Sequence, residues 1–278
     1  MWATEADLDD VVNFLSPLAV QSMFPLANLQ NHGLDGNHPR SPRFWLTRKN
    51  GKLAGALSVT KEGMLMPQSP DMDWAGMSEA LRGLDLIGII GPSDQSRSLL
   101  DSLDLNNVKT TLDHDEPQYS LDLSDLIIPK GRGDIFQLAS ANKEEMIRWR
   151  RDYDIETLNS DFEEASVRAP NEYESYCAEN SHVTLMDGDT ALCTTGFNAR
   201  LPEIVQIGGV YTPPKLRNRA HAKRAVALHL QQAKSEGVKR ATLFSANEFA
   251  SRAYQAIGFT YIGQWTLCLF DGKQRVNE

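Results

Sequence analysis

The chain has 278 residues, a hydrophobic content of 41% and a formal net charge of −9. This length exceeds one domain of about 150 residues and suits two, and the apolar fraction is ordinary for a globular protein. The acidic balance argues against nucleic acid or an anionic membrane surface as a partner. The three cysteines form no metal or redox motif, and the N-terminus lacks a basic, apolar leader. We therefore expect a cytoplasmic protein.

The N-terminal half alternates helical and strand patterns. Residues 7–18 predict an amphipathic helix, with Val12 among its inward residues. Residues 44–60 predict a β-hairpin around an Asn-Gly turn. The apolar run 84–92 predicts a buried strand, followed by a helix that contains Leu99.

Proline and glycine interrupt this pattern between residues 126 and 133, in the segment Leu-Ile-Ile-Pro-Lys-Gly-Arg-Gly. We place the join between two domains there. The sequence thus predicts one domain over residues 1–126 and a second over residues 133–278.

The C-terminal half begins with two predicted helices and a hairpin, at residues 143–159, from residue 172, and at residues 183–197. The next elements are predicted as strand 203–212, helix 220–236, strand 240–245, a short helix that ends at Gly258, and strand 259–270. The order β-α-β-α-β with short connections predicts an α/β fold built on a mixed sheet. Ser245 and Glu248 resemble a capping box at the start of the short helix.

The most informative segment is the turn between strand 203–212 and helix 220–236. Pro213-Pro214 ends the strand, because proline cannot donate to a ladder. Residues 217–222, Arg-Asn-Arg-Ala-His-Ala, then open the helix. Main-chain N–H groups of such a turn, together with the helix dipole, form a binding place for phosphate.

A family resemblance rests on these residues. Arg217, Ala220 and Ala222 match the phosphate-loop pattern of GNAT-family (Gcn5-related) N-acetyltransferases, Arg/Gln-x-x-Gly-x-Gly/Ala. Asn247, the pair Ala253-Tyr254 and the pair Gly258-Phe259 match the family's later signature. The resemblance implies tandem GNAT-like domains, each a twisted mixed β-sheet flanked by helices, with a degenerate first domain.

The resemblance also implies acetyl-coenzyme A as co-substrate. Its pyrophosphate would bind the turn, its pantetheine arm would lie along strand 203–212, and Tyr254 would protonate the departing thiolate. An amine of a small molecule or peptide would attack the thioester directly. The expected cofactor-binding residues are Val210, Tyr211, Thr212, Arg217, Asn218, Arg219, Ala220, His221, Ala222 and Asn247.

Several of these residues have a second, structural interpretation. Glu203 is the nearest acid on the strand and a candidate general base, directly or through water, but also reads as a solvated strand-end charge. Tyr254 alone would suit a core aromatic. Asn247 would equally cap a helix.

The turn departs from the family pattern, because Asn218 and Ala220 stand where glycine is common. If Ala220 has a positive φ, its methyl group costs on the order of 1 kcal/mol. In the N-terminal half the turn is missing, and Asp94 follows the strand where a phosphate would sit. We therefore expect that half to bind no acetyl-coenzyme A and to shape a substrate cleft or an oligomer interface.

Three functions remain open at this stage. The first is an acetyl-coenzyme A-dependent N-acetyltransferase, as a monomer or a homodimer. The altered turn suggests a second, a non-catalytic acyl-coenzyme A sensor. The third is a tandem-domain transferase that uses an aminoacyl-tRNA donor, against which the acidic balance counts.

Overall fold

The computed structural model describes residues 1–276 and divides them into two compact units. The first unit contains residues 1–116 together with the C-terminal segment from Gly263, and the second contains residues 117–262. Residues 126–133, where the sequence predicted the join, lie inside the second unit. Their prolines and glycines mark a loop and not a division between cores. Within residues 1–276, no helix is long and apolar enough to cross a bilayer.

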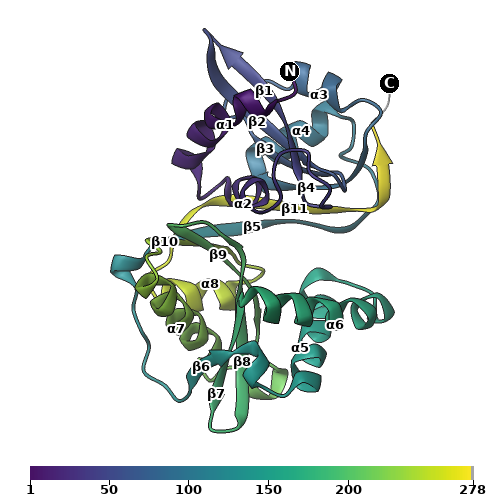
Figure 1. The fold of residues 1–278 in the computed structure, drawn as a ribbon. Helices are drawn as coiled ribbons and strands as arrows, with labels where there is room; N and C mark the ends of the chain where they lie inside the picture. The colour runs from purple at the N-terminus through teal and green to yellow at the C-terminus, as the bar shows by residue number, and fades with distance from the viewer. Residues whose placement is uncertain (277–278) are drawn as a thin grey trace. The chain divides into compact units, whose positions relative to one another are not determined.

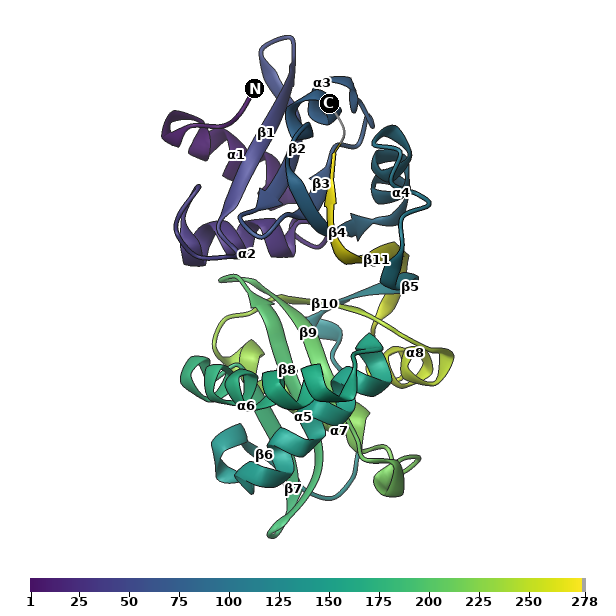
Figure 2. The ribbon, with the colours of Figure 1, turned by 90° about the vertical axis from the view of Figure 1, so that its right-hand side faces the viewer.

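The first unit is a mixed sheet with helices on both sides. Its elements are α1 (Leu8–Leu15), α2 (Met23–His32), β1 (Pro42–Lys49), β2 (Lys52–Thr60), β3 (Met64–Gln68), α3 (Ala75–Leu81), β4 (Asp85–Pro92) and α4 (Ser93–Ser102). The strand order is β1-β2-β3-β4-β11, in which only β3 and β4 are parallel. In Figures 1 and 2, α1 lies on one side of these strands and α4 on the other.

The predicted hairpin is confirmed as β1 and β2. Its turn residues Asn50 and Gly51 both have positive φ, at 50° and 76°, as a tight hairpin turn requires. The predicted first helix is also present, but one of its inward residues is misplaced. Val11 and Leu15 are fully buried, whereas Val12 is 40% exposed, because α1 presents only a narrow stripe to the core.

The second unit contains β6 (Asp134–Gln137), α5 (Lys143–Leu158), α6 (Phe162–Glu179), β7 (His182–Asp187), β8 (Thr190–Arg200), β9 (Ile204–Tyr211), α7 (His221–Ser235), β10 (Arg240–Phe244) and α8 (Glu248–Gln255). The strand order is β5-β10-β9-β8-β7-β6, with β9 and β10 parallel and the other pairs antiparallel. Helices α7 and α8 cover one face, and α5 and α6 cover the other (Figure 1). The predicted mixed α/β fold is confirmed.

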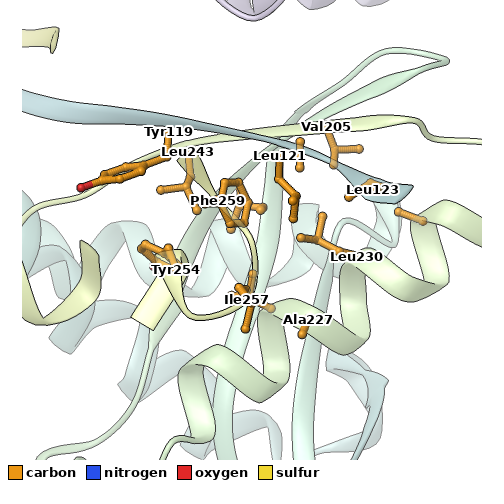
Figure 3. Packing of buried hydrophobic residues seen from close by; sticks show 14 of the residues in the cluster. Tyr119, Leu121, Leu123, Val205, Ala227, Leu230, Leu243, Tyr254, Ile257 and Phe259 are labelled. Atoms are coloured by element: carbon orange, nitrogen blue, oxygen red, sulfur yellow. The ribbon is translucent and has the colours of Figure 1, made fainter. Parts of the chain in front are cut away.

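The main core of the second unit lies between its sheet and the helices α7 and α8 (Figure 3). Leu121 and Leu243 point from the sheet toward Leu230 and Ile257, all at most 2% exposed. This packing fixes α7 against the sheet and therefore fixes the turn that precedes it.

Two strands run from one unit into the other, namely β5 (Thr110–Asp122) and β11 (Thr260–Arg275). From Trp265 onward, β11 pairs with β4 and contributes Cys268 and Phe270 to the first unit's core, which also contains Val276, the residue after β11. The sequence predicted strand 259–270 but assigned it wholly to the second domain. Its position in the first unit follows from the ladder with β4, a pairing between residues far apart in the sequence.

This sharing predicts that the end of the chain stabilises the first unit. Phe270 is 6% exposed, so Phe270→Ala should lower the free energy of unfolding by about 3–5 kcal/mol. Lys273→Ala, at an exposed position of the same strand, should change it by less than about 0.5 kcal/mol. Urea unfolding measures both, and equal effects would contradict the assignment of Phe270 to the core.

Candidate functional site

Strand β9 is paired on its β10 side along only half of its length. The parallel ladder with β10 ends at Ile207 opposite Leu243, and β10 itself ends one residue later. Beyond this point β9 continues through Val210 to Tyr211. The two strands therefore splay apart, and the main-chain groups of Val210 face an open edge where an extended ligand can pair.

The glycine pair in β9, Gly208-Gly209, coincides with a bulge and with close contacts to neighbouring side chains. The β8–β9 register shifts between Thr194 and Gly196, and Gly209 has φ +60°. A methyl group added at Gly208 would lie 1.9 Å from the Asn198 amide, and one at Gly209 would lie 2.9 Å from the imidazole of His182. A side chain at Gly209 would be strained by the positive φ, and one at Gly208 would displace the Asn198 amide.

The predicted turn leads from β9 into α7. A short 3₁₀ turn, Pro214–Leu216, follows the strand, and α7 begins at His221. Asn218 and Ala220 both adopt the left-handed conformation, with φ of 64° and 67°. The methyl group of Ala220 therefore stands in a conformation that favours glycine. The cost on the order of 1 kcal/mol that we expected for a positive φ at Ala220 therefore applies.

Arg217 points back across the turn. Its Nε donates to the Thr212 carbonyl oxygen at 2.8 Å, and its guanidinium pairs with the Glu156 carboxylate of α5. The Tyr211 hydroxyl donates to the same carboxylate at 3.2 Å. Burial and the nearby Glu156 charge raise the pKa of Tyr211 to about 12, so the phenol keeps its proton. Arg217 was predicted to hold phosphate, and here it joins the turn to α5.

A basic hollow of about 420 Å³ lies at the start of α7. Four cationic side chains line it, with Asp187 as the one carboxylate among the described lining residues. The lining consists of Lys130, Gly131, Arg132, Asp187, Leu192, Arg219, Ala220, His221 and Arg224. Three of the predicted phosphate-binding residues, Arg219, Ala220 and His221, thus meet at one cavity.

The 126–133 loop forms the side of this hollow opposite the turn, and Arg224 of α7 holds the loop in place. Its guanidinium donates to the carbonyl oxygens of Pro129, Arg132 and Gly133 at 2.8–3.1 Å. This anchor holds the Lys130 side of the loop beside the first turn of α7. Partial burial, followed by the charge of Arg219, lowers the pKa of His221, as expected in a cationic surrounding.

Sequence reasoning missed Lys130, Arg132 and Arg224. A signal was present, because a Lys-Gly-Arg-Gly run places two cations on a flexible turn. Nothing local in the sequence joins that turn to α7, some 90 residues later. The joining interaction is the long-range hydrogen bonding of Arg224.

Asn247 and Tyr254 both belong to α8. Asn247 is the N-cap, and its side-chain oxygen accepts from the Ala250 N–H at 3.0 Å. The N-cap therefore lies two residues after Ser245, the expected first member of a capping box, and the helix starts at Glu248. The Tyr254 ring is 8% exposed and packs edge-on against Phe259 in the core (Figure 3).

Glu203 lies at the other end of β9 from the splay. Its carboxylate is exposed and pairs with Lys239. Seven residues separate Glu203 from Val210, and at about 3.3 Å per strand residue the separation is roughly 23 Å. Glu203 is therefore too far from the open edge to receive a proton directly there, and its position matches the solvated-charge interpretation.

Comparison with known proteins agrees with this geometry. The model of the acetyltransferase (GNAT) family matches residues 143–259, from the start of α5 to Phe259 just before β11. No curated protein matches the chain in sequence.

Solved structures share the fold over both units. A GNAT-family acetyltransferase from Colwellia psychrerythraea is 14% identical, with a TM-score of 0.51 over 98% of this chain and 100% of that one. A Drosophila protein is 13% identical, with a TM-score of 0.61 over 97% of both chains. A GCN5-related N-acetyltransferase from Kribbella flavida is 15% identical, with a TM-score of 0.51 over 90% of this chain and 96% of that one. At these identities the likeness establishes the fold.

The left-handed Ala220 gives a stability prediction. Ala220→Gly removes the methyl group from an unfavourable conformation and should raise the free energy of unfolding by up to about 1 kcal/mol. Ala178→Gly, at an exposed position of α6, should lower it by a similar amount, because glycine destabilises a regular helix. Denaturant titration of both variants tests the sign, and a loss of stability in Ala220→Gly would contradict the strain at this turn.

Proposed function

Because residues 143–259 form an acetyltransferase (GNAT) domain, we propose that this chain is an acetyl-coenzyme A-dependent N-acetyltransferase. It transfers the acetyl group directly to a primary amine of a small molecule or peptide. The observation that carries the proposal is the basic hollow at the start of α7, the helix that follows the partly unpaired strand β9. The hollow suits a phosphate group, and the unpaired strand edge suits an extended chain that contains amides.

The hollow fits the phosphates of coenzyme A by charge and by position. Lys130, Arg132 and Arg219 supply positive charge, and the first N–H groups of α7 are unpaired within the helix. A diphosphate bound there would accept main-chain hydrogen bonds from the turn. Arg217 would act indirectly, by holding the turn against Glu156.

The pantetheine arm suits the open edge of β9. It contains two amides, and each can exchange hydrogen bonds with the main chain of Val210 and Thr212 in the manner of an added strand. The ladder with β10 ends before these residues. The Thr212 carbonyl oxygen accepts from Arg217, so the main chain of Val210 and the Thr212 N–H are the groups that would bind the ligand. The thioester is then delivered toward the splay between β9 and β10.

The reaction follows from that placement. The amine nitrogen attacks the thioester carbonyl carbon, a C–N bond forms and the C–S bond breaks. The nitrogen gives up one proton and the coenzyme A thiolate gains one, so no proton is consumed overall. Positioning supplies most of the rate increase, and we propose the Tyr254 hydroxyl as the acid that protonates the thiolate.

The first test is binding. Calorimetry should detect acetyl-coenzyme A binding to the full chain, and Arg219→Glu should weaken it by about tenfold or more through loss of a charge-assisted contact. Lys273→Glu makes the same charge change at an exposed site of the first unit and should leave affinity unchanged. Absence of binding would refute the proposal. Binding without transfer to any amine would favour a sensor, for which the methyl group of Ala220 is the structural argument.

The second test concerns Tyr254. Tyr254→Phe keeps the buried ring and removes the hydroxyl, so turnover should fall by about 10²-fold with little change in melting temperature. Tyr261→Phe, at a 53% exposed tyrosine, serves as the control and should retain full turnover. Single-turnover rates of coenzyme A release compare the two, and an unchanged rate in Tyr254→Phe would remove it as the acid.

A further inference from the structure

A small cavity lies on the other face of β9, under α5 and α6. Its free volume is about 20 Å³, enough for one water-sized group. It is bordered by five aromatic side chains, and its described lining contains no carboxylate. The lining residues are Leu138, Met146, Trp149, Arg150, Tyr153, Tyr173, Tyr176, His182, Thr194, Gly209 and Tyr211.

His182 is a polar residue of this cavity that lies beside Gly209 in the splayed part of β9. Its ring lies across the sheet, where a methyl group at Gly196 would come within 2.2 Å of it and one at Gly209 within 2.9 Å. The other ring face stacks on Tyr176 at 3.7 Å. Nδ1 is 2.9 Å from the Ser181 hydroxyl, while Nε2 is buried and has no hydrogen-bond partner among residues 1–276.

The surroundings keep this imidazole uncharged. Burial, then the charge of Arg150 and the proximity of His229, lowers the pKa of His182 to about 3. The groups around the ring are the cavity-lining side chains Arg150 and Tyr153 from α5, Tyr173 and Tyr176 from α6, Thr194 from β8 and Tyr211 from β9, together with His229 from α7. None of them is an anion at neutral pH, so nothing in this set favours a protonated imidazole.

The carboxylates that contact the lining side chains are paired with arginines, and one of them is Glu156, which contacts Tyr211 and pairs with Arg217. Asp154 is fully buried and pairs with Arg150 at 2.8 Å and with Arg168 at 2.8 Å. Glu172 pairs with Arg150 at 2.6 Å. A ligand ammonium entering the cavity would therefore meet Arg150 without a free counter-charge.

The aromatic faces are occupied by cations as well. Arg150 lies over Tyr153 and Tyr176, with distances to the ring centroids of 4.9 and 5.5 Å. Lys143 lies 5.6 Å over Tyr173, and Arg217 lies 5.8 Å over Tyr211. An aromatic cage can bind an alkylammonium through its ring faces, but here the chain's own side chains use four of them.

We infer that the acceptor is an unhindered primary amine that binds in its uncharged form, with one N–H donated to Nε2 of His182. The inference rests on the proposed function, because it supplies the acceptor half of that reaction. In this arrangement the Nδ1–H donates to the Ser181 hydroxyl, which leaves the Nε2 lone pair without a partner, near Gly209 of the cavity lining. An amino group is about the size of a water molecule, so the remainder of the acceptor stays outside.

His182 here is a hydrogen-bond acceptor that orients the nucleophile. The amine enters without its extra proton, so its lone pair is free to attack the thioester carbon. The proton that nitrogen loses after attack passes to solvent, and Tyr254 recovers from solvent the proton it gives to sulfur. No carboxylate base is needed, in agreement with the remote position of Glu203.

Matched amines test the charge selection on the unaltered protein. With saturating acetyl-coenzyme A at pH 7, aniline and acetohydrazide, both uncharged, should exceed benzylamine and ethanolamine, both protonated, by at least about tenfold in kcat/KM. Benzylamine should gain about tenfold per pH unit as it loses its proton, while aniline stays level. N-Methylaniline should react poorly, because the cavity admits only a primary nitrogen.

Variants test the hydrogen bond. His182→Phe keeps the stacked ring and removes Nε2, and should lower kcat/KM for aniline by about tenfold or more without changing acetyl-coenzyme A affinity. His182→Gln, which restores an acceptor oxygen, should recover part of that loss. The control is His229→Phe, since His229 is equally buried but stacks on Phe197 in α7's core. It should stay within about twofold.

The outcomes separate this inference from the proposed function. Failure to bind acetyl-coenzyme A refutes the proposed function itself. Binding with preferred transfer to benzylamine or ethanolamine at pH 7, or with transfer to these protonated amines and none to the uncharged ones, refutes the inference alone. So does a His182→Phe variant that keeps full kcat/KM. If that variant does not fold, the amine series on the unaltered protein still decides.

Discussion

The site depends on a mismatch in length between two parallel strands. β9 and β10 are joined as far as Ile207 and Leu243, and β10 then turns into α8 while β9 continues. Main-chain N–H and C=O groups that lack a strand partner must bond to water or to a ligand. The mismatch therefore creates an edge inside the sheet. The packing of Leu230 and Val226 on the sheet fixes α7 and therefore the turn that follows β9.

Two sources of positive electrostatic potential lie at the start of α7. The helix terminus offers N–H groups, whose effect is short-ranged, and the 126–133 loop offers side-chain charge. The loop is held there by Arg224, which is 15% exposed at its side chain and uses its donors on three carbonyl oxygens. A guanidinium suits this role because its planar donors can satisfy several acceptors at once. The net charge of −9 belongs to the chain as a whole and does not describe this surface.

Local chemistry explains which parts could be predicted. Pro213-Pro214 ends a strand, Asn50-Gly51 forms a tight turn and apolar spacing builds α7, each within a few residues. The short strand β3, the long strand β5 and the transfer of β11 to the first unit escaped prediction, because each is decided by a partner strand distant in sequence. The same limit hid the hollow. Its two walls are some 90 residues apart, and only the folded chain joins them.

The two buried histidines show why environment, more than residue type, assigns a role. Both are at most 4% exposed, both stack on an aromatic ring, and both have one ring nitrogen without a partner among residues 1–276. An unsatisfied buried nitrogen costs about 1–3 kcal/mol, so each is a burden on the fold. The ring of His229 stacks on Phe197 beside the core under α7. The cost of its unpaired Nδ1 therefore only lowers the stability of the fold. For His182 the unpaired nitrogen borders a cavity beside the glycine bulge of β9, where an incoming group can satisfy it and return part of the cost as binding energy.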